Sequence, residues 1–171
     1  MRKMIVAAVA AAMTLALAAP ATAGKPSWAE AAKPGDQTIV QIALASSDFD
    51  VLVAAVSRAG LVPLLNGDGD FTVFAPTDAA FEATFGASEA DIITMINDGD
   101  LDGALGNILG YHVTEGRRTS KSVLSAGQFQ MLNGDKLTLG ELVTAGIDLG
   151  ASDISASNGI VHVLTAGVLL P

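Results

Sequence analysis

The chain has 171 residues, of which 50% are hydrophobic, 5% are aromatic and none is cysteine. This length predicts one domain, and 18 acidic against 9 basic residues give a net charge of −9, which argues against nucleic acid or an anionic lipid surface as partner. Without cysteine, disulfides, thiol chemistry and lipid-modified cysteines are excluded, so the hydrophobic core must stabilise the fold.

Residues 1–23 are typical of an export signal. Arg2 and Lys3 precede an apolar run over 5–19, and Ala21-Thr22-Ala23 supplies the small residues that signal peptidase requires. The apolar run is short for a transmembrane helix, so we expect no membrane span. The mature chain would keep 7 basic and 18 acidic residues, a net charge of −11. We therefore expect a secreted or periplasmic protein.

Cleavage is predicted after Ala23, because Ala21 and Ala23 flank the bulkier Thr22. N-terminal sequencing of the exported protein should begin at Gly24. A start more than a few residues away, or retention of Met1, would contradict the signal assignment.

The first half of the chain after the signal reads as helical. Residues 24–37, which include Trp28, carry Pro and Lys without an apolar period and predict a linker before a domain over 38–171. Helix, strand and turn signals then follow in order: a helix capped by Ser47 and ended by Gly60, a strand over Phe71–Ala75 stopping at Pro76, a helix capped by Thr77 or Asp78, a helix opened by a capping box at Ser88–Asp91, and an apolar stripe over Leu101–Leu109.

The second half changes to a period of two. Alternating apolar residues on both sides of Asn133-Gly134 predict a β-hairpin. Short strands are also expected over 142–149, 154–157 and 160–164, with Asn158-Gly159 linking the last two. Helices followed by strands indicate an α+β domain.

Catalytic and metal motifs are missing from the sequence. It contains no nucleophile elbow, no Ser-x-x-Lys and no His-Glu-x-x-His, and its two histidines are isolated. The run Asp98–Gly103 matches the start of a calcium loop, but Leu109 occupies the position of the bidentate Glu. We therefore expect no enzymatic activity, no cofactor and no metal site.

Three stretches together resemble the fasciclin (FAS1) domain family. Phe71-Thr72-Val73-Phe74-Ala75-Pro76-Thr77-Asp78-Ala79-Ala80-Phe81 resembles the first family signature. Asn107-Ile108-Leu109-Gly110-Tyr111-His112-Val113 is similar to its Tyr-His motif. Asn158-Gly159-Ile160-Val161-His162-Val163-Leu164, closing on Val168-Leu169-Leu170-Pro171, is similar to the second signature. The resemblance covers about 38–171 and departs from the family at Leu164-Thr165, where Ile-Asp is more usual.

The resemblance implies a β-sandwich or wedge with packed helices, mainly in the N-terminal half, and a non-enzymatic role in adhesion or extracellular binding of a protein or polysaccharide. A small exported member of this kind looks bacterial. The alternative is a carrier of an apolar small molecule such as a carotenoid or lipid. Tyr111 and His112 are the hypothetical partner contact, with Tyr111 expected near the surface. Thr77, Asp78 and His162 are expected to be structural, with a His162 ring nitrogen bonded to the Thr77–Asp78 segment.

Overall fold

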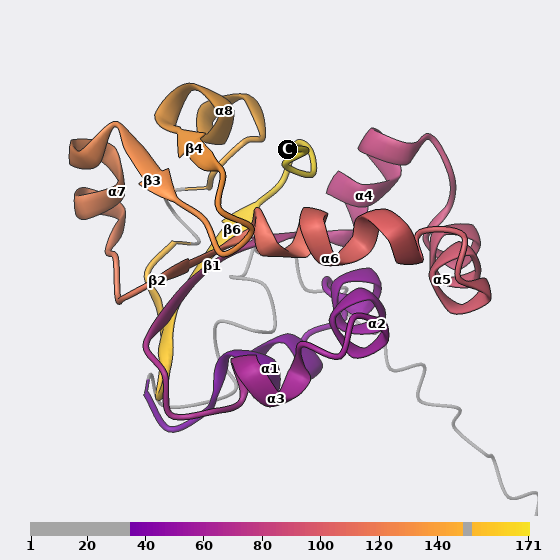
Figure 1. Ribbon diagram of the computed structural model, residues 1–171, viewed down its shortest axis with the longest axis horizontal. Coiled ribbons are helices and arrows are strands. Elements are labelled where there is room, and N and C mark those ends of the chain that lie inside the picture. The colour runs from indigo at the N-terminus through magenta and orange to yellow at the C-terminus, as the bar shows by residue number, and fades with distance from the viewer. Residues whose placement is uncertain (1–34, 149–151) are drawn as a thin grey trace, which may run out of the picture.

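The computed structural model describes residues 35–148 and 152–171. The predicted signal, Trp28 and most of the predicted linker lie outside these residues. The helices are α1 (Ile39–Leu44), α2 (Asp50–Arg58), α3 (Val62–Leu65), α4 (Asp78–Phe85), α5 (Glu89–Asp98), α6 (Asp102–Gly110), α7 (Ser120–Ala126) and α8 (Leu139–Thr144). The strands are β1 (Phe71–Pro76), β2 (Val113–Glu115), β3 (Gln128–Gln130), β4 (Lys136–Thr138), β5 (Ile154–Ala156) and β6 (Gly159–Leu164). This mixture of helices and strands confirms the α+β class (Figure 1).

A four-stranded sheet in the order β2-β1-β6-β5 forms the centre of the fold. Its middle strands, β1 and β6, run parallel, with Phe71 opposite Gly159 and Pro76 opposite Leu164. The outer strands pair antiparallel, and β3 and β4 form a separate hairpin. The two strands that carry the family signatures are therefore direct neighbours.

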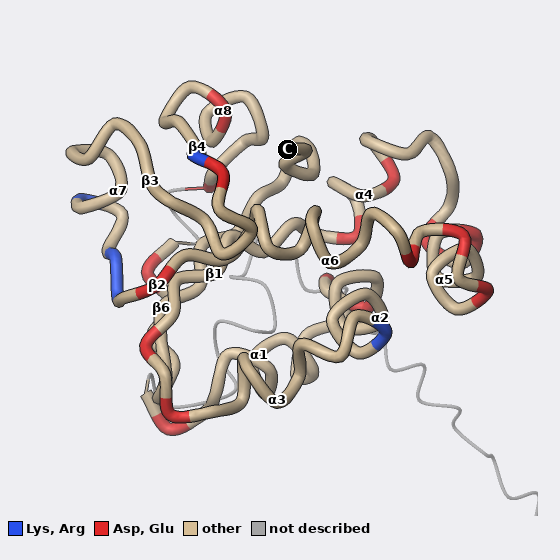
Figure 2. Tube along the Cα trace, viewed as in Figure 1, with Lys and Arg blue, Asp and Glu red and all other residues tan. Residues whose placement is uncertain are grey.

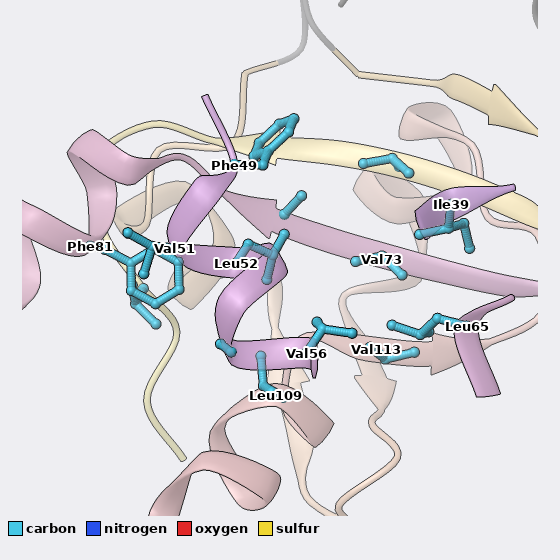
Figure 3. Close-up of a cluster of buried hydrophobic side chains, with 14 of the residues drawn as sticks. Ile39, Phe49, Val51, Leu52, Val56, Leu65, Val73, Phe81, Leu109 and Val113 are labelled. Carbon is cyan, nitrogen blue, oxygen red and sulfur yellow. The ribbon is translucent and has the colours of Figure 1, made fainter. Parts of the chain in front are cut away.

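Both faces of the sheet are buried, and β1 shows how the sequence achieves this. Successive side chains of a strand point to opposite faces. Phe71, Val73 and Ala75 belong to the core shared with α1, α2 and α4–α6 (Figure 3), whereas Phe74 belongs to the core under the β3–β4 hairpin and α8. The Phe74 ring lies 6.4 Å from that of Phe129 in β3. A strand buried on both faces explains the nearly continuous apolar run of this segment.

The start of α2 differs from the prediction. The helix begins at Asp50 after an N-cap, Phe49, that makes no side-chain hydrogen bond, so the prediction of Ser47 as cap was wrong. Asp78 supplies the cap instead, because its carboxylate accepts hydrogen bonds from the backbone N–H groups of Asp50 (3.2 Å) and Val51 (2.9 Å). Thr77 caps α4 by accepting from Ala80 N–H. Adjacent residues of the first signature thus cap two different helices.

Replacing Asp78 by Ala should lower the free energy of unfolding by about 1–3 kcal/mol, because two helix-terminal N–H groups lose a buried acceptor. Asp78→Asn keeps one amide oxygen as acceptor and should lose less. Urea unfolding of both variants measures the difference. Asp68→Ala, in an exposed turn, is the control and should change stability by less than about 0.5 kcal/mol. An Asp78→Ala variant as stable as this control would contradict the assignment of Asp78 as the cap.

The second half contains two helices, α7 and α8, where the period-two pattern of apolar residues predicted only strands. The strand predicted over 142–149 was wrong, because α8 extends into this range as far as Thr144, after a reciprocal capping box between Thr138 and Glu141. Helix α7 was also not predicted. The hairpin at Asn133-Gly134 and the strands near 154–157 and 160–164 are confirmed. At Ser88 only half of the predicted capping box forms, because Asp91 accepts from the Ser88 hydroxyl and not from its backbone.

Across residues 35–148 and 152–171, no helix is both long enough and apolar enough to cross a bilayer.

Candidate functional site

Tyr111 lies at the C-terminal end of α6, where the sequence predicted a surface position. Its ring is instead buried, with 4% of the residue exposed, in the core beneath the hairpin and α8. The phenol donates to the carbonyl oxygen of Lys136 (3.2 Å) and lies 3.3 Å from a carboxylate oxygen of Glu141. Burial and the negative charge of Glu141 raise the pKa of this hydroxyl. The prediction of surface exposure was therefore wrong.

His112, the second residue of the Tyr-His pair, is 2% exposed and joins α6 to the C-terminal segment. Its Nδ1 lies 2.8 Å from the carbonyl oxygen of Ile108, and its Nε2 lies 3.0 Å from Leu169 N–H. A carbonyl can only accept and an N–H can only donate, so the neutral ring carries its proton on Nδ1. Burial lowers the pKa of His112 to about 4.

His162, in β6, is fully buried and stacks on Phe74, with the ring centroids 5.5 Å apart. Its Nε2 lies 2.8 Å from the carbonyl oxygen of Arg118, and its Nδ1 is 3.4 Å from Asp153 N–H. The predicted bond to Thr77–Asp78 is replaced by these partners. The parallel register explains why: His162 lies opposite Phe74, and it is Leu164 whose carbonyl accepts from Thr77 N–H.

The calcium-like run Asp98–Gly103 is divided between the end of α5 and the start of α6. Asp102 forms an ion pair with Arg58 at 2.6 Å, which lowers the pKa of the Asp102 carboxyl, and Leu109 is buried.

A second group of carboxylates consists of Asp50, Asp78 and Glu89, with one oxygen of each residue within 4.8 Å of the others. The Asp78 oxygens already accept the α2 cap bonds.

Calcium up to millimolar concentration should leave the melting temperature unchanged. The Asp98–Gly103 run offers no bidentate ligand from the twelfth position, and Asp78 is committed to backbone N–H groups. Thermal unfolding with calcium or with a chelator measures this, and calorimetry provides a second readout. Stoichiometric calcium binding would refute the prediction.

An apolar cavity of about 140 Å³ lies between α1, α2, α3 and the β1–β2 side of the sheet. Figure 3 shows part of its lining, including Ile39, Leu52, Val56, Leu65 and Val113. Only Ser57 and His112 add polar side chains to the lining. Because both His112 nitrogens are already paired, the interior offers a ligand almost no hydrogen bonds.

A surface hollow of about 270 Å³ adjoins the cavity, between α3, α6 and the segment around Leu132. Leu61, Leu65, Leu109 and Val113 line both spaces. We call the cavity and this hollow together the apolar groove. Leu44, Leu64 and Leu132 border it and are 62%, 43% and 37% exposed. The groove is therefore lined mainly by apolar side chains and bordered by exposed leucines.

Comparisons with known proteins identify the family of this chain. The family model described as Fasciclin domain matches residues 47–171. The chain belongs to the fasciclin (FAS1) family. It is 36% identical over 146 residues to Protein sll1483 of Synechocystis, covering 83% of this chain and 78% of that protein. It is 34% identical over 138 residues to the transforming growth factor-beta-induced protein ig-h3 of Sus scrofa, covering 78% of this chain but only 19% of that protein.

The fold comparison agrees with the family assignment. A solved FAS1 domain pair from the insect cell adhesion molecule Fasciclin I matches with a TM-score of 0.52 and 16% identity. The match covers 79% of this chain and 51% of that chain, so the chain spans about half of the domain pair. This similarity confirms the FAS1 fold expected from the sequence.

The apolar groove of this FAS1 domain was not among the predicted site residues. One sequence signal could have indicated it: five of the six residues of α1, Ile39-Val40-Gln41-Ile42-Ala43-Leu44, are apolar. An amphipathic helix buries one apolar stripe, whereas a helix that is apolar nearly all round needs a second apolar neighbour. Ile42 lies in the core, Ile39 lies in the core and also lines the groove, Val40 and Ala43 pack against the core and line the groove, and exposed Leu44 lines its edge.

Proposed function

We propose that this FAS1 domain is an exported, non-enzymatic binding module that holds a protein partner outside the cytoplasm through the apolar groove. The family assignment and the predicted signal support a role in adhesion or in binding at the cell surface or in the periplasm. The observation that carries the proposal is the exposure of Leu44, Leu64 and Leu132 around one groove. Contiguous exposed apolar surface is typical of interaction sites.

The chemistry of the groove favours a protein over a polysaccharide. A sugar chain needs many hydrogen-bonding groups, whereas the cavity lining is apolar apart from Ser57 and His112. Leucine and valine side chains instead match apolar side chains of a partner protein. The two histidines support the non-enzymatic part of the proposal, because all four of their ring nitrogens have partners within the fold.

Photo-crosslinking in the native envelope tests the proposed function. A photoreactive amino acid replaces Leu44 at the groove or, in the control, Val143 on α8. Both residues are 62% exposed, but Val143 does not line the groove. We expect a discrete protein adduct from position 44 that position 143 does not give. The same adducts from both positions, or none from position 44, would contradict the proposal.

A second candidate function, the carrier of an apolar small molecule such as a carotenoid or lipid, is favoured by the cavity itself. Protein purified from its native host would then carry a pigment or an extractable neutral lipid. Ala43→Phe projects a ring into the cavity lining and should abolish the co-purification. Thr94→Phe, on exposed surface of α5, is the control. Ligand-free native protein would contradict this candidate.

Tyr111 and His112 remain a proposed partner contact, and their positions favour an indirect role. His112 lines the cavity. Tyr111 borders a separate hollow beside α8, together with Thr144 and Leu170. Both residues are buried, so a change in either would act on binding largely through the shape of these surfaces.

A further inference from the structure

Arg118 lies in the segment between β2 and α7, and its backbone is fixed on both sides. Its N–H donates to the Thr72 hydroxyl at 2.8 Å, and its carbonyl oxygen lies 2.8 Å from Nε2 of His162. The guanidinium carbon lies 5.3 Å from the centre of the Phe129 ring, which is cation–π geometry. The side chain is therefore held against the hairpin.

The guanidinium of Arg118 has no anionic partner among the described residues. Arg58 and Arg117 form ion pairs with Asp102 and Asp70, and Arg117 also donates to Ser155 and to Ala156 O. Across the described ranges, Arg118 Nε is the one buried side-chain nitrogen or oxygen without a hydrogen-bond partner. A nitrogen without accessible surface cannot be reached from solvent. The groups open to a partner are the two terminal Nη nitrogens of Arg118, which are not buried and bond to no described residue.

Arg118 lines a largely polar cleft of about 360 Å³ between β2 and the hairpin, which we call the Arg118 cleft; the other lining residues are Thr114, Glu115, Gln130, Met131, Leu132 and Gly134. Two hydrogen bonds fix its walls, from the Thr114 hydroxyl to Gln130 O and from Leu132 N–H to Val113 O. Leu132 also lines the hollow of the apolar groove, so the cleft and the hollow share this residue at their border.

We propose that the Arg118 cleft binds a carboxylate of the partner while the adjoining apolar groove binds neighbouring apolar side chains. The occupant is a peptide segment with apolar residues next to one Asp or Glu. This inference rests on the proposed function and adds the chemistry of the partner. A carboxylate accepts two parallel N–H bonds from a guanidinium fork, and the two accessible Nη nitrogens of Arg118, a residue that lines the cleft, offer such a fork.

The negative charge of this protein favours a partner that places only one carboxylate in the Arg118 cleft. Glu115 lines the same cleft, and acidic residues far outnumber basic ones along the described chain (Figure 2). A run of acidic residues or a phosphate dianion would meet this negative field. The cleft is far larger than one carboxylate, and polar Gln130 and apolar Leu132 line it beside Arg118, which favours a peptide over a fatty acid.

The test uses NMR of the mature protein with ¹⁵N-labelled arginine, observing the Arg118 Nε–H signal. The probes are acetyl-Leu-Leu-Asp-amide, the neutral isostere acetyl-Leu-Leu-Asn-amide, and acetate at equal concentrations. The protein variants are Arg118→Gln, Arg118→Lys, which keeps the charge without the fork, and Lys121→Gln as matched control. Lys121 is exposed on α7 and its replacement removes one positive charge nearby in the chain. Thermal unfolding verifies that each variant is folded.

We expect the Asp peptide to shift the Arg118 signal and to bind at least tenfold more tightly than the Asn peptide. Arg118→Gln should abolish this tenfold preference, Arg118→Lys should keep only part of it, and Lys121→Gln should leave it intact. Equal affinity for the Asp and Asn peptides would overturn the carboxylate site and leave the proposed function standing. Acetate binding as tightly as the peptide would overturn the peptide occupant. No Arg118 shift at saturating peptide would overturn the inference, whereas failure of the proposed function would appear in the crosslinking experiment.

Discussion

Replacing Tyr111 by Ala should lower the free energy of unfolding by about 3–5 kcal/mol, the cost of deleting a buried aromatic ring. The ring is 4% exposed and packs in the same core as Phe74, Phe129 and Leu142. Tyr111→Phe keeps this packing and loses only the hydroxyl contacts with Lys136 O and Glu141. The Phe variant should therefore cost about 1 kcal/mol.

Urea unfolding of both Tyr111 variants measures these costs, with Val143→Ala on exposed α8 as the control. An Ala variant within about 1 kcal/mol of the wild type would contradict the burial of the ring. Tyr111→Phe also tests the proposed partner contact, because it separates binding from folding. Weaker capture of the crosslinked partner by a stable Phe variant would assign a contact to the hydroxyl, and unchanged capture would assign Tyr111 to the core alone.

Acidification from pH 7 to pH 4 should remove roughly 3 kcal/mol of stability through His112 alone. The folded state holds the pKa of His112 at about 4, whereas an unfolded histidine titrates near 6.5. Between these values the unfolded chain binds the proton and the folded chain does not. The stabilisation is therefore present above pH 6.5 and is lost as the pH falls toward 4. The pKa of His162 is also lowered by burial and acts in the same direction.

Unfolding free energies measured by urea at pH 7, 6, 5 and 4 test this titration. His112→Asn retains an amide donor for Ile108 O but has no group that titrates in this range. The variant should be less stable at pH 7, and the difference from the wild type should shrink as the pH falls. If the unfolding free energies of the wild type and of His112→Asn changed with pH by the same amount, the assignment of the titration to His112 would be contradicted. The buried Asp78, whose raised pKa favours the folded state at lower pH, is common to both proteins and cancels in this difference.

Local patterns predicted the elements whose signals are contained in a few neighbouring residues. Asn133-Gly134 identified the hairpin, Thr77 the cap of α4, and Asn158-Gly159 the link into β6. The cap of α2 could not be predicted in this way, because Asp78 is 28 positions from Asp50 along the chain. The prediction missed α8 for a different reason. Its capping box joins Thr138 to Glu141, but the alternating apolar residues around Asn133-Gly134 favoured strands in this part of the chain.

The candidate site was harder to predict than the fold. The Tyr-His pair was found from the resemblance, but its burial depends on packing from the hairpin, α8 and the C-terminal segment. The apolar groove joins α1, α3, α6 and Leu132, and no single stretch of sequence contains it. Arg118 follows Arg117 and lies near Lys121 in an acidic chain, a grouping that by itself indicates no site. The structure distinguishes Arg118 from Arg117, whose two terminal nitrogens bond to Asp70, Ser155, Ala156 and Ser157.

Because β1 pairs in parallel with β6, the centre of the sheet can form only after the C-terminal part of the domain is available. Phe71 and Gly159, the first pair of the register, are 88 positions apart, so closing the centre of the sheet requires nearly the whole domain. Contacts between distant residues slow folding because the chain entropy of a long loop must be overcome first. A chain emerging from a ribosome therefore cannot complete this sheet until β6 is available. If the predicted export signal acts early, that delay would keep the chain extended enough to be threaded across a membrane.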